Sequence, residues 1–130
     1  MILTREAILA VQDIRIESVD VPEWGGSVLV RALTAAEREI FEVAATSGDA
    51  GKRVINWGQF QARLCALAIV DEAGQRVFTD ADINALAAKS GAAVTRVFAL
   101  AQKLAGLGAE DIEEITRNFT ATQPGGSLSS

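Results

Sequence analysis

The side chains best suited to chemistry in this sequence are carboxylates, which occur in three groups. Asp71 is followed by Glu72, Asp80 lies two residues before Asp82, and a longer acidic run occupies residues 110–114. Paired carboxylates can hold a divalent cation or serve as general acid and base. Acidic residues are also common in polar turns and at helix starts, where they accept backbone hydrogen bonds and match the helix dipole. We therefore expect no metal, no cofactor and no catalytic residue.

Nucleophilic catalysis has little support in the residue types. The chain has no histidine and a single cysteine, Cys65, which lies inside an apolar run. Without histidine neither a Ser–His nor a Cys–His pair can form, and no motif marks a lysine-assisted serine. A lone cysteine among apolar neighbours is typical of a small buried side chain. We predict that the protein is not an enzyme and works through its surfaces and shape.

Length and composition indicate one soluble domain. The 130 residues are 49% hydrophobic but only 5% aromatic, which favours a core of small and aliphatic side chains. The net charge of -5 argues against a nucleic-acid partner, because such proteins neutralise phosphates with basic groups. No stretch approaches the roughly 20 apolar residues of a membrane span, and no secretory leader is recognisable. We expect a cytoplasmic location and no membrane partner.

The pattern of the first 33 residues predicts a short helix and then a β-hairpin. Thr4 can cap a helix over residues 4–11. Residues 14–21 alternate between apolar and polar with one slip, which a bulge would explain. Residues 27–33 form the second strand, after a Gly-Gly turn. Trp24 beside that turn has two interpretations, as a lid on one end of the core or as an exposed partner contact.

The next segment predicts a helix, a loop and an ambiguous apolar run. Thr34 and Glu37 have the spacing of a capping box, so a helix should extend to about residue 45 and residues 46–51 should form a loop. Residues 63–70 fit neither period cleanly, and we favour a strand over a helix there because a polar turn and a second apolar segment follow. The face expected to be apolar on the first of these helices comprises Ala36, Ile40, Phe41 and Ala44.

The C-terminal half is predicted to be mainly helical, so the fold class is α+β. Thr79 and Ser90 can each cap a helix, and residues 110–119 predict a last one with an acidic first turn. Residues 1–119 then form one domain, and the small polar residues 120–130 form a disordered tail. The apolar stripe of the first of these helices comprises Ile83, Leu86 and Ala87, and that of the second comprises Val94, Val97, Phe98, Ala101, Leu104 and Ala105. Gly106 and Gly108 should end the second helix.

Several segments, taken in order, resemble the phage tail assembly chaperones of long, non-contractile tails. The resemblance extends over about residues 2–119, and no single phrase defines it. The phrases that carry it are LTREAIL (3–9), VDVPEWGG (19–26), LTAAER (33–38), VDEAGQRVFTDAD (70–82), KLAGL (103–107), EEI (113–115) and NF (118–119).

The resemblance implies a function without covalent chemistry. Such a chaperone would bind and solubilise the tape measure protein in the host cytoplasm, help recruit tail tube subunits, and be absent from the mature virion. It would self-associate into rings or spirals, and a longer frameshifted form would be common. The alternative is a structural tail or head–tail connector protein that stays in the virion.

The family motif defines no binding residues, so candidates come from the apolar side chains of the last two predicted helices. A chaperone of an apolar helix needs adaptable apolar surface on a soluble body. The predicted partner-binding residues are Val97, Leu100, Leu104, Ile112, Ile115 and Phe119.

Overall fold

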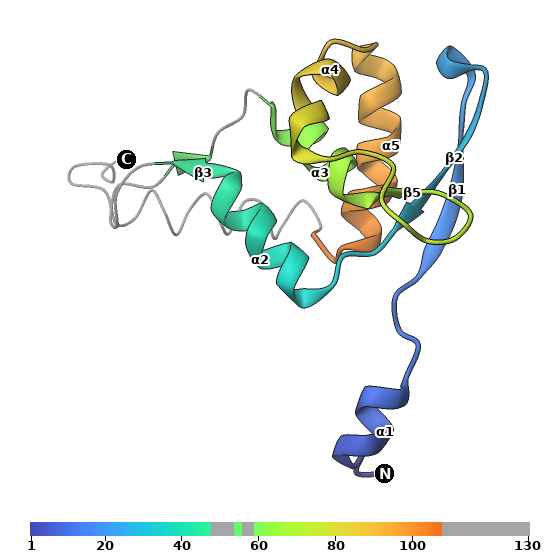
Figure 1. Ribbon diagram of the computed structural model, residues 1–130, viewed down its shortest axis with the longest axis vertical. Coiled ribbons are helices and arrows are strands. Elements are labelled where there is room, and N and C mark those ends of the chain that lie inside the picture. The colour runs from blue at the N-terminus through green and yellow to red at the C-terminus, as the bar shows by residue number, and fades with distance from the viewer. Residues whose placement is uncertain (48–53, 56–58, 108–130) are drawn as a thin grey trace, which may run out of the picture.

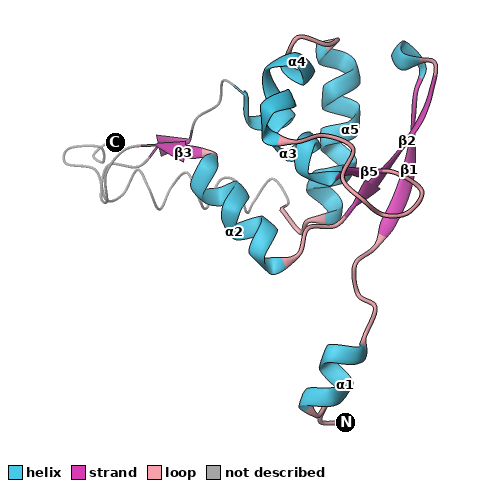
Figure 2. Cartoon of the chain, in the orientation of Figure 1, coloured by secondary structure: helices cyan, strands magenta, loops and turns pink. Residues whose placement is uncertain are grey.

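The described residues form an α+β fold, as predicted, in which a small antiparallel sheet packs against helices from the C-terminal half. The computed structural model describes residues 1–47, 54–55 and 59–107 (Figure 1). The main sheet has three antiparallel strands in the order β1-β2-β5, and a two-stranded ladder pairs β3 with β4 (Figure 2). The elements are α1 (Arg5–Ala10), β1 (Ile16–Val21), η1 (Pro22–Trp24), β2 (Gly26–Arg31), α2 (Ala35–Ala44), β3 (Thr46–Ser47), β4 (Val54–Ile55), α3 (Phe60–Ala68), β5 (Ile69–Val70), η3 (Asp80–Asp82), α4 (Ile83–Ala87) and α5 (Gly91–Leu104).

The predicted hairpin forms, but it contains no bulge. β1 and β2 pair without interruption from Ile16 opposite Arg31 to Val21 opposite Gly26. The apparent slip in the alternation arises because Ile16 lies on the exposed face of the sheet, while Val21 on the other face is completely buried. Pro22 ends β1 and begins the short helix η1, and Gly25 closes the turn at a φ of 78°, where a residue with a Cβ would be strained.

The capping box at the start of α2 is confirmed, whereas its predicted apolar face is wrong in part. The Thr34 hydroxyl accepts a hydrogen bond from the Glu37 amide, and the Glu37 carboxylate accepts one from the Thr34 amide. Phe41 is buried as predicted, but Ile40 is 57% exposed. Ala36 is exposed too, because the buried face is centred on Phe41 and Ala45, four residues apart. The first two residues of the predicted loop, Thr46 and Ser47, form β3, and residues 48–51 lie outside the described residues.

The strand predicted over residues 63–70 is wrong for most of its length. Phe60–Ala68 is the helix α3, and only Ile69–Val70 is a strand, β5, which pairs with Leu29 and Val30 of β2. The helix lacks a polar face because it is central in the fold: the consecutive side chains from Leu64 to Ala68 are all buried. A helix buried all round shows no 3.6-residue period, so its sequence cannot be told from a buried strand.

The two predicted helices that follow are confirmed with small changes. Asp82 completes a second capping box with Thr79 ahead of α4, and Ser90 caps α5. Ala87 of α4 is exposed, contrary to its predicted place in the stripe. Gly106 ends α5 in the left-handed region, at a φ of 72°. Some predictions concern residues that the structure does not describe. These are the helix end at Gly108, the helix over 110–119 and the tail 120–130.

The core lies where α3 meets α5, α2 and the inner face of the sheet. Phe60 of α3 is central, with ring centroids 5.2 Å from Phe41 and 5.8 Å from Phe98. Elsewhere small residues bring the helices together: Ala93 is completely buried, and the Cys65 thiol reaches the Val94 carbonyl oxygen at 3.7 Å. Cys65 is therefore the buried side chain that was predicted.

The first 14 residues, which we call the N-terminal arm, lie away from this core. Figure 1 shows α1 below the body of the molecule, joined to β1 by an extended segment. Thr4 caps α1 as predicted, through a 3.2 Å hydrogen bond from the Ala7 amide, yet no residue of α1 is buried. The arm is thus helical without packing on any described part of its own chain.

Candidate apolar binding groove

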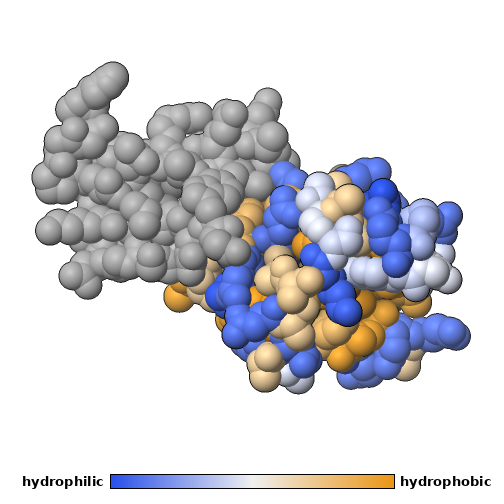
Figure 3. All heavy atoms as spheres, turned by 90° about the horizontal axis from the view of Figure 1, so that it is seen from above, coloured by the Kyte–Doolittle hydropathy of each residue, from blue (hydrophilic) through white to orange (hydrophobic). Residues whose placement is uncertain are grey.

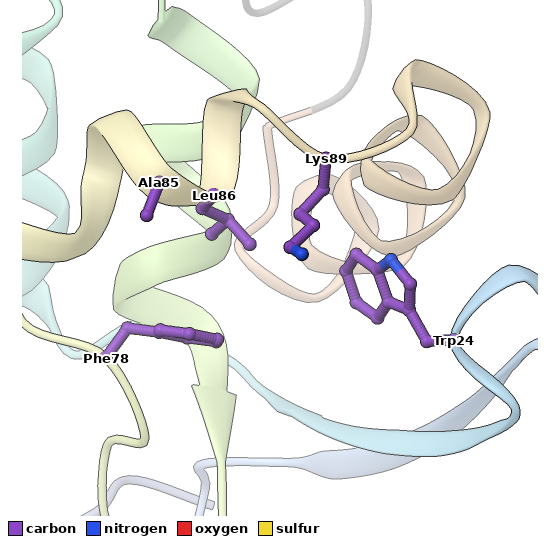
Figure 4. A pocket seen from close by; sticks show the side chains of 5 residues that line it. All are labelled: Trp24, Phe78, Ala85, Leu86 and Lys89. Carbon is purple, nitrogen blue, oxygen red and sulfur yellow. The ribbon is translucent and has the colours of Figure 1, made fainter.

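Two adjoining hollows form an apolar groove between the hairpin turn, the loop after β5 and α4. The first, of about 340 Å³, is lined by Trp24, Phe78, Ala85, Leu86 and Lys89. Figure 4 shows Trp24 on one side, Phe78 on the other and Leu86 between them, with the Lys89 amino group directed toward the indole. The second hollow, of about 400 Å³, shares Trp24 and Phe78 and continues over the end of β5. We call the two together the apolar groove; the second is also lined by Ser27, Val28, Leu29, Ile69, Val70, Asp71, Glu72 and Val77.

An ion pair fixes the Trp24 side of the groove. Glu23, in the same short helix η1, accepts a hydrogen bond from the Arg96 guanidinium of α5. The Arg96 hydrogen bond is the main reason why the pKa of Glu23 is lowered, and a backbone hydrogen bond adds to the effect. Both side chains are partly exposed, so the ion pair adds little to the stability of the fold, and its main effect is to position the hairpin turn. It holds the hairpin turn, and Trp24 with it, beside α5.

The Phe78 side is fixed by a structured turn and an arginine. The Asp71 carboxylate accepts hydrogen bonds from the amides of Ala73 and Gln75, at 2.9 and 3.0 Å, and so closes the turn after β5. Arg76 then donates two hydrogen bonds to the Ala66 carbonyl oxygen of α3, at 3.2 and 3.0 Å. Because the loop is anchored at both points, Phe78 is held half-buried over the core.

The third wall, α4, is positioned by its own cap. The Asp82 carboxylate accepts a 2.8 Å hydrogen bond from the Thr79 amide, which orients the helix start. Leu86 is then buried at the base of the groove, while Ala85 and Lys89 are exposed along its rim. The lining of the groove is thus mainly apolar, with one cation, Lys89, in the first hollow and the carboxylates of Asp71 and Glu72 in the second.

The predicted partner-binding residues are placed elsewhere, on α5 or outside the described residues. Val97 is 0% exposed and belongs to the core, so a partner could reach it only if α5 left the body. Leu100 and Leu104 are half-buried and pack against the core, and their part in binding stays a prediction. Ile112, Ile115 and Phe119 lie outside the described residues. Val97, Leu100 and Leu104 do not line the groove.

The groups considered for chemistry have structural roles where the structure describes them. Asp71 and Asp82 accept backbone hydrogen bonds in a turn and a cap. Burial raises the pKa of the Cys65 thiol to about 12, which makes it a poor nucleophile. Within residues 1–47, 54–55 and 59–107, no three His, Cys, Asp or Glu side chains gather as a metal site would require. In the same ranges, no helix has the length and apolar character to span a membrane.

Sequence reasoning did not find the groove, although one signal pointed to it. Trp24 was open to interpretation as an exposed partner contact, and the structure makes it a wall of the groove while it also packs against the core. Phe78, Leu86 and Lys89 carried no comparable signal, because each has an ordinary place in its own element. Only the packing of α4 against the loop brings them beside the hairpin turn.

Comparison with known proteins supports the resemblance found in the sequence. A family model described as phage tail assembly chaperone matches residues 3–118. The chain therefore belongs to the phage tail assembly chaperone family, and its function lies in tail assembly. The matched range includes the N-terminal arm from residue 3 onward and every wall of the groove. Neither the curated proteins nor the solved structures contain a significant match to this chain.

Proposed function

We propose that this protein binds apolar helical segments of the tape measure protein, keeps them soluble during tail assembly and helps recruit tail tube subunits. The observation that supports this most is the apolar groove on an acidic chain. Seen from above, the described part exposes apolar surface between polar side chains (Figure 3). A net charge of -5 keeps such a protein soluble while its apolar surface stays available.

The shape and lining of the groove suit a helical segment as the guest. An amphipathic helix binds by placing apolar side chains, three or four residues apart, into a hydrophobic groove. The two hollows, of about 340 and 400 Å³, are each within the size range of binding pockets and adjoin at Trp24 and Phe78. Large aromatic side chains such as these contribute much of the binding energy in protein interfaces. Two neighbouring apolar side chains of one helix face would fill the two hollows.

The proposed action requires no covalent step and takes place in the host cytoplasm. The protein would leave when the tube assembles, and would be absent from the finished virion. Mass spectrometry of purified particles tests this part: a tail or connector subunit would be present in stoichiometric amount, and a chaperone would be lost. Recovery of this chain at the level of known tail proteins would refute the proposal.

Co-expression with a tape measure fragment tests the groove itself. The wild-type chain should raise the soluble yield of the fragment. Ala85→Glu places a carboxylate on the groove wall at an exposed position, and should abolish most of that gain without unfolding the protein. Ala87→Glu, on the same helix but outside the groove, is the matched control and should act like wild type. Equal solubilisation by all three proteins would refute the groove as the binding site.

A further inference from the structure

The N-terminal arm exposes more apolar surface than any other described segment. Leu9 is 67% exposed, and the arm's other exposed large apolar side chains are Met1, Ile2, Leu3, Ile8, Val11 and Ile14. A helix as short as α1, with six residues, is marginal in water unless it packs on another surface. Because α1 packs on no described part of its own chain, its apolar side chains are accessible to another molecule.

We infer that the arm docks in the apolar groove of a second copy of this chain. Figure 1 places α1 at one end of the long axis, with α4 and the hairpin turn, which form the groove, toward the other end. Each copy therefore offers an arm at one end and a receptor at the other. Contacts between two different surfaces repeat from copy to copy, and produce a ring when they close or a spiral when they do not. The inference deepens the proposed function and rests on it, because both use the groove.

The charges of the arm match those of the groove. At 100° per residue, Leu9 lies on the face of α1 between Arg5 and Glu6. These two side chains contact each other at 3.5 Å but are more than three-quarters exposed, so both can reach a partner. In the groove, Lys89 lines one hollow and Glu72 the other, and neither forms an ion pair with any described residue.

This pattern selects one orientation for the docked arm. Leu9 enters the apolar floor, Glu6 faces Lys89 and Arg5 faces Glu72 of the second copy. Arm and tape measure segment then compete for one site. A tape measure helix displaces the arm when it binds, and the arm covers the groove when no tape measure is present, which limits non-specific association of exposed apolar surface.

Sedimentation velocity over a range of protein concentrations tests the role of Leu9. Wild type should form oligomers, and Leu9→Asp should raise the dissociation constant by about tenfold or more, since burial of a leucine side chain is lost. The matched control is Ile40→Asp, which places the same charge at an exposed apolar site on α2 and should leave association unchanged. The inference would be overturned if the wild type were monomeric at every concentration. It would also be overturned if Ile40→Asp, but not Leu9→Asp, dissociated the oligomer.

A charge exchange tests which surface receives the arm. Glu6→Lys and Lys89→Glu should each weaken association about fivefold at low salt, and the double variant should return to within about twofold of wild type. Lys103→Glu, at an exposed site on α5, is the control for loss of a positive charge and should have no effect. Failure of the double variant to recover would show that the arm does not meet Lys89, and would overturn the inference.

These measurements use the chain alone, so they separate the inference from the proposed function. If the arm contacts only the tape measure protein, Leu9→Asp lowers solubilisation but leaves self-association unchanged, and the inference is wrong. If the arm docks in the groove of a second copy but the protein does not solubilise a tape measure fragment, the proposed function is wrong.

Discussion

Cys65 provides a direct test of the packing between α3 and α5, because it is the chain's single thiol and is completely buried. Its burial raises the thiol pKa to about 12. An ordinary cysteine, with a pKa of about 8.5, is roughly one-quarter thiolate at pH 8. At a pKa of about 12 the thiolate fraction falls to about one in ten thousand, a decrease on the order of a thousandfold. Alkylation, which requires the thiolate, should slow by at least this factor in the folded protein.

The assay compares iodoacetamide labelling of Cys65 with and without a denaturing concentration of urea, followed by intact-protein mass spectrometry at pH 8. The denatured chain reports the unprotected rate, and the folded chain should react at least about a thousandfold more slowly. A Phe60→Leu variant, which loosens the neighbouring core, should label faster in proportion to its loss of stability. Labelling of the folded wild type at nearly the denatured rate would refute the packing of Cys65 against Val94.

Three further predictions concern stability, measured by urea unfolding. Thr34→Ala should lower the free energy of unfolding by about 1 kcal/mol, whereas Thr4→Ala should not, because the helix that Thr4 caps packs on no described part of its chain. For Glu37, burial opposes ionisation, but the Thr34 amide and the Arg31 guanidinium outweigh it and lower the pKa. Its contribution should be full above the unfolded pKa of about 4.3 and be lost as pH falls through the lower folded value, so Glu37→Gln should cost stability at pH 7 but not near pH 3. Phe60→Ala should cost about 3–5 kcal/mol, since Phe60 is buried between two other rings; a loss below 1 kcal/mol would contradict this core.

The elements that sequence alone predicted correctly are those encoded by a few neighbouring residues. Thr34 and Glu37 close a capping box across one helical turn, and Pro22 and Gly25 define the hairpin turn by their own backbone preferences. Such interactions need no distant partner, so the spacing of residue types was sufficient. The family resemblance has the same basis, because it depends on short phrases in a constant order.

Tertiary structure decided the features that depend on what each segment packs against. The run from Leu64 to Ala68 is a helix that is buried on every side, and this burial removes the polar residues that would have shown its period. The groove was equally hidden, since Trp24 and Lys89 are 65 positions apart and come together only when α4 packs beside the hairpin turn. The sequence determined local conformation and the absence of histidine chemistry; contacts between distant residues, which no local pattern encodes, determined the core and the binding surface.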